Sequence, residues 1–204
     1  SKNRKKFNFF YNALNKVDYI VISPGIDIKL TRFKSILYKN RKKIITDLDL
    51  FYMQNLPVKS IVVTGTNGKS TTCKLIQHVL RTNKMDAQLG GNIGKPILDL
   101  KIKKKSIVII EASSFQLFYT KFIKPTFAVI LNIAKDHLDW HGTIKNYKNS
   151  KFNIFSKQDN QGYALLNNQE LIKQFRKKKF LSKLKKIQDN TLEKYIKNKY
   201  LLSK

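Results

Sequence analysis

The sequence is poor in the residues that would cross-link the chain or carry it across a membrane. Only one of its 204 residues is a cysteine, Cys73, so the chain cannot form an internal disulfide framework. No apolar run approaches the roughly 20 residues of a membrane-spanning helix. The basic segment 1–12 lacks the apolar region and the cleavage site of a signal peptide. We therefore expect a reducing, cytoplasmic setting and no membrane span.

Acidic residues are also scarce, since 13 Asp and Glu stand against 41 Lys and Arg and leave a formal net charge of +28. Two explanations remain open. Only five of the basic residues are arginine, and Lys, Asn and Ile are the residues that AT-rich codons encode, which favours compositional drift. A surface selected for binding polyanions is the alternative. The densest clusters, Lys101–Lys105 and Arg176–Lys186, lack a repeated aromatic stacking pattern, so we do not expect nucleic acid as a partner.

Short apolar runs alternate with segments of helical pattern, and 42% of the residues are hydrophobic, enough for a packed core. The expected strands are 17–23, 60–64, 107–110, 127–133 and 163–166. The expected helices are 47–54, 70–82, 96–100, 114–119 and 147–155, with a helix, a turn and a strand within 36–45. This alternation predicts an α/β fold whose parallel sheet is covered on both faces.

Three further features qualify this pattern. In the helix 70–82, Leu75, Ile76, Val79 and Leu80 form the expected apolar stripe, and Cys73 should face the interior. Pro57 marks an expected domain boundary. The lysine-rich tail after Arg176 should be a helix or a poorly ordered end.

The stretch VVTGTNGKSTT, Val62–Thr72, lies between an expected strand and an expected helix, which is the context of a phosphate-binding loop. Its glycines permit backbone conformations that turn successive N–H groups toward an anion. Lys69 can reach the β- and γ-phosphates of ATP, and the Ser70 hydroxyl can bind Mg²⁺. The predicted loop consists of Gly65, Thr66, Asn67, Gly68, Lys69, Ser70 and Thr71. Because a valine replaces the first glycine of G-x-x-x-x-G-K-[ST], a polar turn with a capping hydroxyl is the alternative.

Polar residues also follow the other expected strands. Glu111 comes directly after one strand and His137 shortly after another, while Asn92 lies in the glycine-rich stretch GGNIGKP. Ligands of open α/β sheets bind at the carboxyl ends of the strands, so Glu111 and His137 should share the edge of the phosphate loop. A carboxylate there suits Mg²⁺, and a histidine suits a metal or a substrate oxygen. Taken alone, Glu111 could be a capping acid and His137 a surface residue.

The other two histidines, His78 and His141, are assigned no function and are interpreted as ordinary helix and loop residues.

Four motifs in this order resemble the Mur ligases, which are ATP-dependent amide-forming enzymes of peptidoglycan precursor synthesis. The motifs are VTGTNGKSTT, GGNIGKP, EASSFQL and LNIAKDHLDWHG, and the resemblance covers roughly residues 17–170. Together, GGNIG and SSFQL favour the branch that joins D-glutamate to UDP-MurNAc-L-alanine. The resemblance therefore implies those two substrates, ATP and Mg²⁺, and a reaction through an acyl phosphate.

The resemblance also implies roles for single residues. Asn92 and His137 would contact the UDP-sugar substrate or a second metal site, and Gly25, in SPGI, would lie near the substrate diphosphate. Lys151, in YKNSKFNIF, resembles a family lysine that becomes carbamylated and acts as an anion near Mg²⁺. The implied catalytic residues are Lys69, His137 and Lys151, and the implied metal-binding residues are Ser70, Glu111, His137 and Lys151.

A domain order follows from the same resemblance. Residues 1–57 would form the end of a Rossmann-like, UDP-binding N-terminal domain, and residues 58–204 an incomplete ATP-binding central domain. Because no C-terminal ligase domain is expected within these residues, we expect a fragment that is inactive by itself, and a monomer. Folylpolyglutamate synthetase, which GTNGKS alone would fit, and a basic nucleic-acid-binding module are the alternatives.

Overall fold

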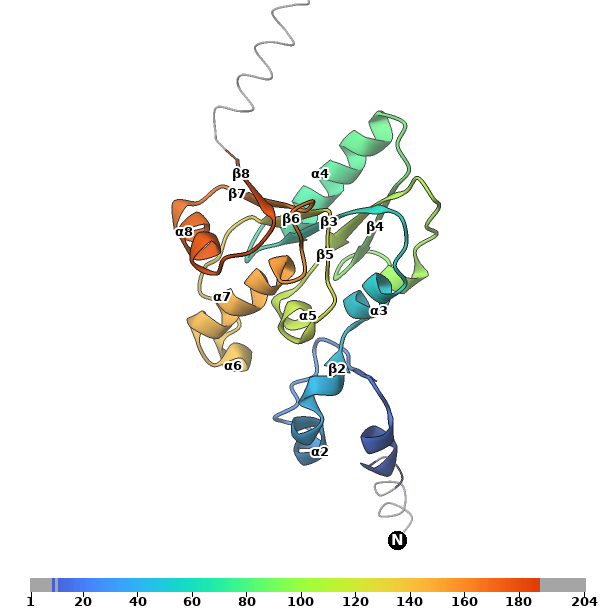
Figure 1. Ribbon diagram of the computed structural model, residues 1–204, viewed down its shortest axis with the longest axis vertical. Coiled ribbons are helices and arrows are strands. Elements are labelled where there is room, and N and C mark those ends of the chain that lie inside the picture. The colour runs from blue at the N-terminus through green and yellow to red at the C-terminus, as the bar shows by residue number, and fades with distance from the viewer. Residues whose placement is uncertain (1–8, 10, 188–204) are drawn as a thin grey trace, which may run out of the picture.

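A parallel β-sheet forms the centre of the molecule (Figure 1), as the sequence predicts, and it has six strands. The structure is a computed structural model that describes residue 9 and residues 11–187. The strands lie in the order β4-β5-β3-β6-β7-β8, and every neighbouring pair is parallel. Their bounds are Lys59–Thr64 for β3, Ala87–Gly91 for β4, Ile107–Glu111 for β5, Phe127–Ile130 for β6, Tyr163–Leu166 for β7 and Lys183–Lys186 for β8.

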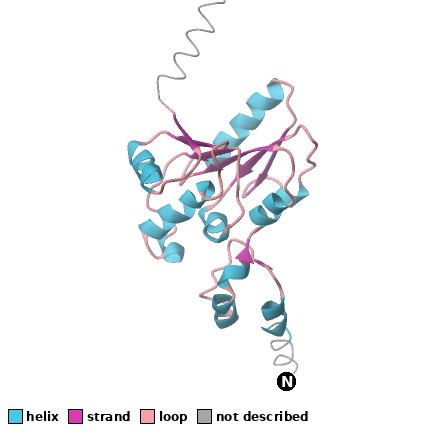
Figure 2. Cartoon of the chain, viewed as in Figure 1, coloured by secondary structure: helices cyan, strands magenta, loops and turns pink. Residues whose placement is uncertain are grey.

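Helix α4, Lys69–Thr82, covers one face of this sheet (Figure 2). Its interface is a small apolar cluster of Val63, Cys73, Ala87, Ile109 and Val129. Ile76 and Leu80 pack against this cluster, as predicted. Leu75 and Val79, however, are 59% and 56% exposed, so the prediction of a four-residue buried stripe is wrong for these two. They lie on the solvent side of a helix whose other side alone touches the sheet.

The opposite face carries the larger core. Four helices cover it: α3 (Asp47–Met53), α5 (Ser114–Tyr119), α7 (Ile144–Phe152) and α8 (Gln169–Lys177). Because successive strand residues point to opposite faces, Val62 and Ile110 enter this core while their neighbours face α4. Phe155 packs edge-to-face on Phe152 and Phe175, with ring centroids 5.8 and 5.1 Å apart. Burial on both faces explains why these strands are continuous apolar runs.

A smaller unit precedes the sheet and lies below it in Figure 1. It contains two short parallel strands, β1 (Ile20–Val21) and β2 (Ile44–Ile45), with α2 (Lys34–Lys39) and a 3₁₀ turn, Arg41–Lys43, between them. Its own core consists of Leu14, Ile20, Ile22, Ile28, Ile36, Leu37 and Ile44. Leu48 and Phe51 of α3 belong instead to the core of the six-stranded sheet. The domain boundary near Pro57 stays a prediction.

The carboxylate of Asp49 ties helix α3 to the segment after α5. Its Oδ1 accepts hydrogen bonds from Thr120 Oγ1 and from the backbone N–H groups of Lys121 and Phe122, each at 2.7 Å. Its Oδ2 accepts one from the N–H of Thr46 at 2.9 Å, which caps the helix. Asp49 is fully buried, and both of its oxygens are hydrogen-bonded. We call this set of contacts the domain junction.

Several local predictions need correction. Residues 96–100 form only a 3₁₀ turn, Ile97–Asp99, because Pro96 and the extended Leu100 enclose it. The strand β4 was not expected, and β8 lies where a helix or a poorly ordered end was predicted. The rest of that tail, 188–204, lies outside the described residues. No helix within the described residues has the length and apolar character to cross a membrane.

Candidate active site at the phosphate loop

The predicted phosphate loop lies between the end of β3 and the start of α4. Gly68 adopts a φ of 81°, which favours glycine, and it precedes the first residue of α4. A Cβ on Gly65 would lie 3.1 Å from Leu131 Cβ and 3.3 Å from the Asn67 carbonyl oxygen, a closer approach than most side chains tolerate. Both glycines are therefore required by the shape of the loop.

Asn132 holds this loop from the end of β6, a contact that the sequence did not predict. Its Oδ1 accepts a hydrogen bond from the Asn67 N–H at 2.9 Å, and its Nδ2 donates to the Asn67 carbonyl at 3.1 Å. Its own carbonyl accepts from the Thr66 N–H at 3.0 Å. A polar residue directly after the apolar run of β6 was the available signal.

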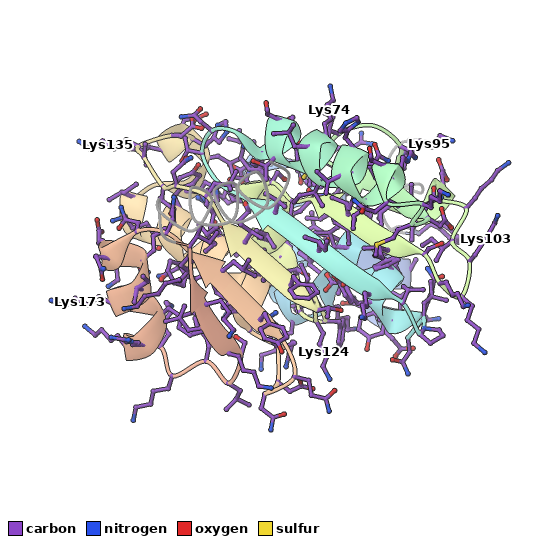
Figure 3. All side chains as sticks on the ribbon, turned by 90° about the horizontal axis from the view of Figure 1, so that it is seen from above. Lys74, Lys95, Lys103, Lys124, Lys135 and Lys173 are labelled. Atoms are coloured by element: carbon purple, nitrogen blue, oxygen red, sulfur yellow. The ribbon has the colours of Figure 1, made fainter. Side chains whose placement is uncertain are left out.

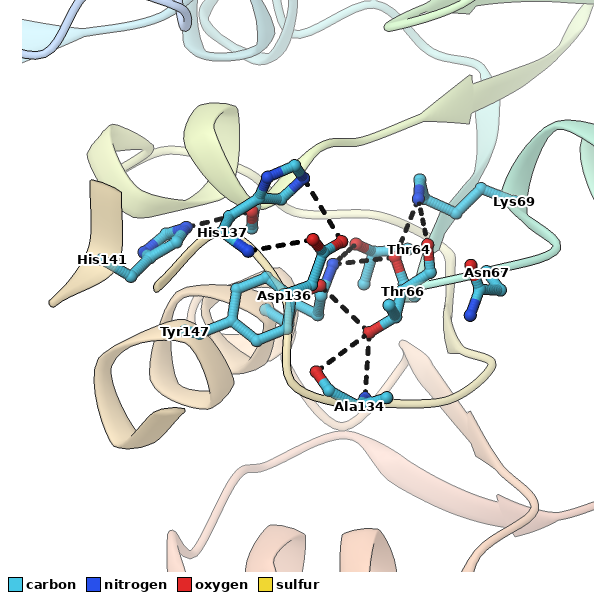
Figure 4. Close-up of polar contacts among 12 residues, drawn as sticks. Thr64, Thr66, Asn67, Lys69, Ala134, Asp136, His137, His141 and Tyr147 are labelled. Atoms are coloured by element: carbon cyan, nitrogen blue, oxygen red, sulfur yellow. Dashed lines mark hydrogen bonds and ion pairs between the residues drawn. The ribbon is translucent and has the colours of Figure 1, made fainter. Parts of the chain in front are cut away.

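Lys69 is folded back onto the loop (Figure 4). Its Nζ donates to the carbonyl oxygens of Gly65 at 2.9 Å and Thr66 at 2.8 Å. Ser70 and Thr71 follow in the first turn of α4, where Ser70 is half-buried and Thr71 is exposed. Free N–H groups and a lysine at a helix N-terminus suit an anionic ligand such as a phosphate.

Glu111, the last residue of β5, lies beside the base of the loop. It pairs in register with Val63, two residues before Gly65, and it is only 2% exposed. Its Oε1 accepts a hydrogen bond from Asn92 Nδ2 at 2.9 Å, while its Oε2 is buried without a hydrogen-bond partner. A buried carboxylate oxygen without a partner is costly unless a ligand completes it.

This unpartnered oxygen fits a Mg²⁺ ion. The described residues contain no group of three or more His, Cys, Asp or Glu that could hold a metal on their own. Mg²⁺, however, commonly binds one or two carboxylates and takes its other ligands from substrate phosphates and water. Glu111 therefore supplies the type of single carboxylate that a metal bound to a nucleotide uses.

The glycine-rich stretch places Asn92 next to Glu111. Gly91 has a φ of 107°, and a Cβ there would lie 2.5 Å from the Glu111 carbonyl oxygen, so only glycine fits. The Asn92 N–H donates to that same carbonyl at 2.8 Å. With its side chain on the Glu111 carboxylate, Asn92 orients the predicted metal ligand from a largely exposed position.

The structure brings Lys151 to the phosphate loop. Its Nζ donates to the Gly65 carbonyl at 2.8 Å and lies 3.4 Å from Thr64 Oγ1, and the residue is only 1% exposed. Lys69 donates to the same Gly65 carbonyl. Burial, and secondly the positive charge of Lys69, lower the pKa of Lys151 from 10.5 to about 7.

Tyr147 connects Lys151 to the loop, and sequence reasoning missed it. Its hydroxyl is 3.0 Å from Thr66 Oγ1, and the Lys151 Nζ lies 4.7 Å from the centre of its ring (Figure 4). Thr66 Oγ1 also accepts a hydrogen bond from the Ala134 N–H at 3.0 Å. The buried tyrosine thus joins helix α7, the phosphate loop and the segment after β6.

His137 is the N-cap residue of the short helix α6, Leu138–His141, and has a left-handed φ of 50°. Its Nε2 is 3.4 Å from Asp136 Oδ2, and its ring lies 4.8 Å from the ring of Phe115 and 6.3 Å from that of Tyr147. Its side chain is 46% exposed, so it can meet a ligand. His137 follows β6 and Glu111 ends β5, and these two strands flank β3, whose carboxyl end carries the loop.

His141 is not the ordinary loop residue that the sequence indicated. It is 3% exposed, its Nε2 lies 3.0 Å from Ser114 Oγ, and its ring stacks on Phe115. Burial, with smaller contributions from His137 and Lys151, lowers its pKa to about 4, so the ring is neutral. Its spacing of four residues from His137 was the one signal available from sequence.

Gly25 lies away from these strand ends. It lines a hollow between the smaller unit and α6, together with Asp27, Asp139 and Trp140. Since His137 directly precedes α6, this hollow lies beside the helix that follows the predicted site residue.

Comparisons with known proteins agree with the fold and the motifs. Residues 63–202 match the family described as the Mur ligase middle domain. The UDP-N-acetylmuramoylalanine–D-glutamate ligase of Rickettsia bellii is 43% identical over 152 residues, which cover 74% of this chain and 33% of that protein. The enzyme of the same name from Buchnera aphidicola is 42% identical over 146 residues, or 70% of this chain and 32% of that protein. The chain thus spans about a third of the length of these relatives.

Solved structures show the same fold at lower identity. A UDP-N-acetylmuramate:L-alanyl-gamma-D-glutamyl-meso-diaminopimelate ligase from Neisseria meningitides superposes with a TM-score of 0.57 at 19% identity, over 86% of this chain and 60% of that chain. MurF ligase from Thermotoga maritima, in complex with ADP, gives a TM-score of 0.53 at 19% identity, over 84% and 48% of the two chains. With the family match and the curated relatives, these findings show that the chain belongs to the Mur ligase family and contains its middle domain.

Proposed function

We propose that this chain supplies the ATP-binding part of a ligase that joins D-glutamate to UDP-MurNAc-L-alanine in peptidoglycan precursor synthesis. The observation that carries the proposal is the meeting of three features at one sheet edge. These are the phosphate loop, the unpartnered Glu111 Oε2 and the buried Lys151. Relatives that are 42–43% identical and named for this reaction support the choice of substrates.

The reaction requires two anions to approach one another. The substrate carboxylate attacks the γ-phosphorus of ATP, ADP leaves, and an acyl phosphate forms. The amine of D-glutamate then attacks the acyl carbon and expels phosphate. The Lys69 Nζ would give up its hydrogen bonds to the Gly65 and Thr66 carbonyl oxygens and would donate to phosphate oxygens instead. The backbone N–H groups of the loop would hold the β-phosphate. Mg²⁺, which Glu111 and Ser70 would hold, supplies charge neutralisation when bound.

Lys151 would become an anion by carbamylation. The ammonium group first gives up one proton; the neutral amine nitrogen then bonds to the carbon of CO₂ and loses a second proton, which leaves a carbamate anion. The lowered pKa supports this step, because only the neutral amine reacts. A carbamate beside the Gly65 carbonyl would attract the metal that an ammonium group repels.

The substrate would extend from the smaller unit to this edge. Gly25 would lie near its diphosphate, while Asn92 and His137 would contact its sugar or a second metal. The hollow between Gly25 and α6 supports this path. A cytoplasmic location and a monomeric state are part of the same proposal.

Nucleotide binding can be tested on the chain itself. We expect Lys69→Ala to weaken binding of ATP with Mg²⁺ by about tenfold or more, because it removes a charge-assisted contact to phosphate. The matched control is Lys74→Ala, an exposed lysine on the same helix (Figure 3), which should leave the affinity unchanged. Equal affinities of the two variants would refute the role of Lys69.

The choice of substrates needs a complete enzyme. In a hybrid, residues 17–170 of this chain would replace the corresponding residues of the Rickettsia bellii relative. We expect phosphate release from ATP only when both UDP-MurNAc-L-alanine and D-glutamate are present. Release that needs neither substrate, or none in a folded hybrid that binds ATP, would contradict the proposal.

Binding of nucleic acid remains the weaker proposal. The labelled lysines of Figure 3 come from different helices and loops and project to several sides of the molecule. A protein that binds nucleic acid without sequence preference instead gathers its charge along a groove with stacking aromatic residues.

A further inference from the structure

A cavity of about 390 Å³, which we call the junction cavity, lies beside the domain junction, between the smaller unit and the helices α5 to α7. One side comes from the smaller unit and includes Lys29, Tyr38 and Arg41. The other comes from α5, α6 and the segment after α5, and includes Phe118 and Trp140. None of its lining residues belongs to the phosphate loop, and neither Glu111 nor Lys151 is among them. The volume is within the range of pockets that hold small molecules.

Aromatic side chains form the walls of the junction cavity. Phe118 and Tyr38 remain 43% and 37% exposed, which is large for side chains of this size beside a buried core. Phe118 packs edge-to-face on Trp140 with ring centroids 5.0 Å apart, and Tyr119 lies 5.8 Å from the same indole. The rings therefore leave apolar faces open toward the cavity, where a planar ring could stack.

Two residues of the cavity lining each carry a fully buried polar atom that has no hydrogen-bond partner within the described residues. The two atoms are Trp140 Nε1 and His141 Nδ1. The His141 side chain is otherwise fixed, since Nε2 meets Ser114 Oγ at 3.0 Å and the residue is 3% exposed. Buried polar groups of this kind normally find a partner in protein, water or ligand.

The charge of the lining is positive. Three cations, Lys29, Arg41 and Lys121, stand against one carboxylate, Asp27. Lys121 already donates to the carbonyls of Lys42 and Ile44 at 2.5 Å, so its role is structural. Lys29 Nζ has only a 3.4 Å contact with the Trp140 carbonyl, and Asp27 Oδ1 accepts from the Lys29 N–H. The Arg41 guanidinium has no partner among the described residues, so it and Lys29 remain able to bind an anion.

We propose that the junction cavity binds a small planar aromatic carboxylic acid. Its ring would lie against Phe118, Tyr38 and Trp140, and its carboxylate would meet Lys29 and Arg41. Because the ligand would contact both units, binding would stabilise their observed arrangement. Asp27 and Trp140 also line the hollow at Gly25, so the junction cavity adjoins the path of the proposed substrate.

The chain's single tryptophan lies in this cavity, which makes the test direct. In a ¹⁵N-labelled sample, Trp140 gives the one indole N–H resonance. We expect titration with 2-naphthoate to shift this resonance to saturation. The neutral 2-naphthamide should bind about tenfold more weakly, because it lacks the charge-assisted contact. Equal affinities of the two probes, or no saturable shift with 2-naphthoate, would overturn the proposal.

Variants locate the anion contact. Lys29→Met and Arg41→Met should each weaken 2-naphthoate binding by about fivefold to tenfold and leave 2-naphthamide binding unchanged. The control Lys34→Met, an exposed lysine on α2 outside the cavity, should match the parent chain. ATP affinity should be the same in all of them, which separates this proposal from the phosphate loop. If neither Lys29→Met nor Arg41→Met differs from Lys34→Met, the assigned site is wrong.

Discussion

The domain junction and the phosphate-loop edge both bury a carboxylate, and they differ in what surrounds it. At the junction, Asp49 is fully buried and both oxygens accept hydrogen bonds. At the loop, Glu111 is 2% exposed and keeps one oxygen without a partner. A buried charge that the protein satisfies completely stabilises the fold. A buried carboxylate with only one hydrogen-bonded oxygen lowers the stability of the fold, and its second oxygen remains available to a ligand.

The same contrast separates two lysines, the half-buried Lys121 and the buried Lys151. Lys121 donates to carbonyls at the junction and closes the 3₁₀ turn of the smaller unit. Lys151 shares one carbonyl oxygen with Lys69, and its charge is opposed by burial and by that neighbour. The charged groups of the junction are therefore compensated by hydrogen bonds and stabilise the fold. The charged groups of the loop edge are only partly compensated, so a ligand or a modification can change their charge.

The largest expected effect falls on the satisfied carboxylate. Asp49→Ala should lower the free energy of unfolding by about 3–4 kcal/mol, because it leaves three backbone N–H groups and two hydroxyls without their acceptor. Urea denaturation would measure the loss. Asp47→Ala is the matched control, since Asp47 accepts hydrogen bonds only from Gln116 Nε2 among the described residues and should cost less than half as much. Equal losses would remove the distinction between the two regions.

His141 lies between the two regions. Its Nε2 has a hydrogen-bond partner and its Nδ1 has none, so the effect of its protonation on stability tests the comparison between the two regions. Its folded pKa of about 4 is below the ordinary 6.5, so between these values the unfolded chain binds a proton that the folded chain does not. Stability is therefore lost as the pH falls through this window, by about 2 kcal/mol between pH 7 and 5.

Denaturation of His141→Asn at both pH values tests this. Between pH 7 and 5 the variant should lose about 2 kcal/mol less unfolding free energy than the parent. His78→Asn, which changes an exposed helix residue, should behave like the parent. A parent-like pH dependence of His141→Asn would show that the ring is not held neutral.

Glu111→Gln should separate stability from binding. We expect no loss in the free energy of unfolding, because the change removes a buried charge with an unpartnered oxygen. The affinity for ATP should fall by about tenfold in Mg²⁺ and stay unchanged in EDTA, since the lost ligand acts only through the metal. The exposed control Glu170→Gln should retain full affinity in Mg²⁺. If Glu111→Gln is less stable than the parent and its ATP affinity depends on Mg²⁺ as in the parent, then Glu111 has a structural role like that of Asp49 and does not bind the metal.

Local sequence was sufficient for one part of the site. Residues of the phosphate loop are contiguous, and the glycines, the lysine and the flanking strand and helix reveal the turn without knowledge of the rest of the chain. The strands β3, β5, β6 and β7 were predicted for a similar reason, because burial on both faces makes most of their residues apolar. Strand β4 was not predicted because it contains two glycines and few β-branched residues. Strand β8 was not predicted because it lies at the sheet edge and three of its four residues are lysines.

Contacts between distant segments set the limit of sequence reasoning. Lys151 meets Gly65 across 86 positions of the chain, and nothing distinguishes it from 35 other lysines except its resemblance to a family motif. Tyr147 and Thr66 are 81 positions apart, and Asn132 and Asn67 are 65 apart. Such pairs are created by strand order, which sequence periodicity does not specify.

Tyr147→Phe gives the smallest expected effect and tests whether the loop edge depends on that long-range contact. The change removes the hydroxyl that meets Thr66 and keeps the ring under Lys151, so it should cost about 1 kcal/mol of unfolding free energy. ATP affinity should fall a few-fold, because the loop loses one of its fixed points. Tyr163→Phe is the control, since that hydroxyl has no hydrogen bond among the described residues and the substitution keeps the ring that stacks on Phe127 and lies under Lys183. If both variants bind ATP like the parent, the Tyr147 hydroxyl is not needed to hold the phosphate loop. Asn132 and the loop glycines then fix the loop by themselves, and the loop edge is more rigid than its unpartnered charges indicate.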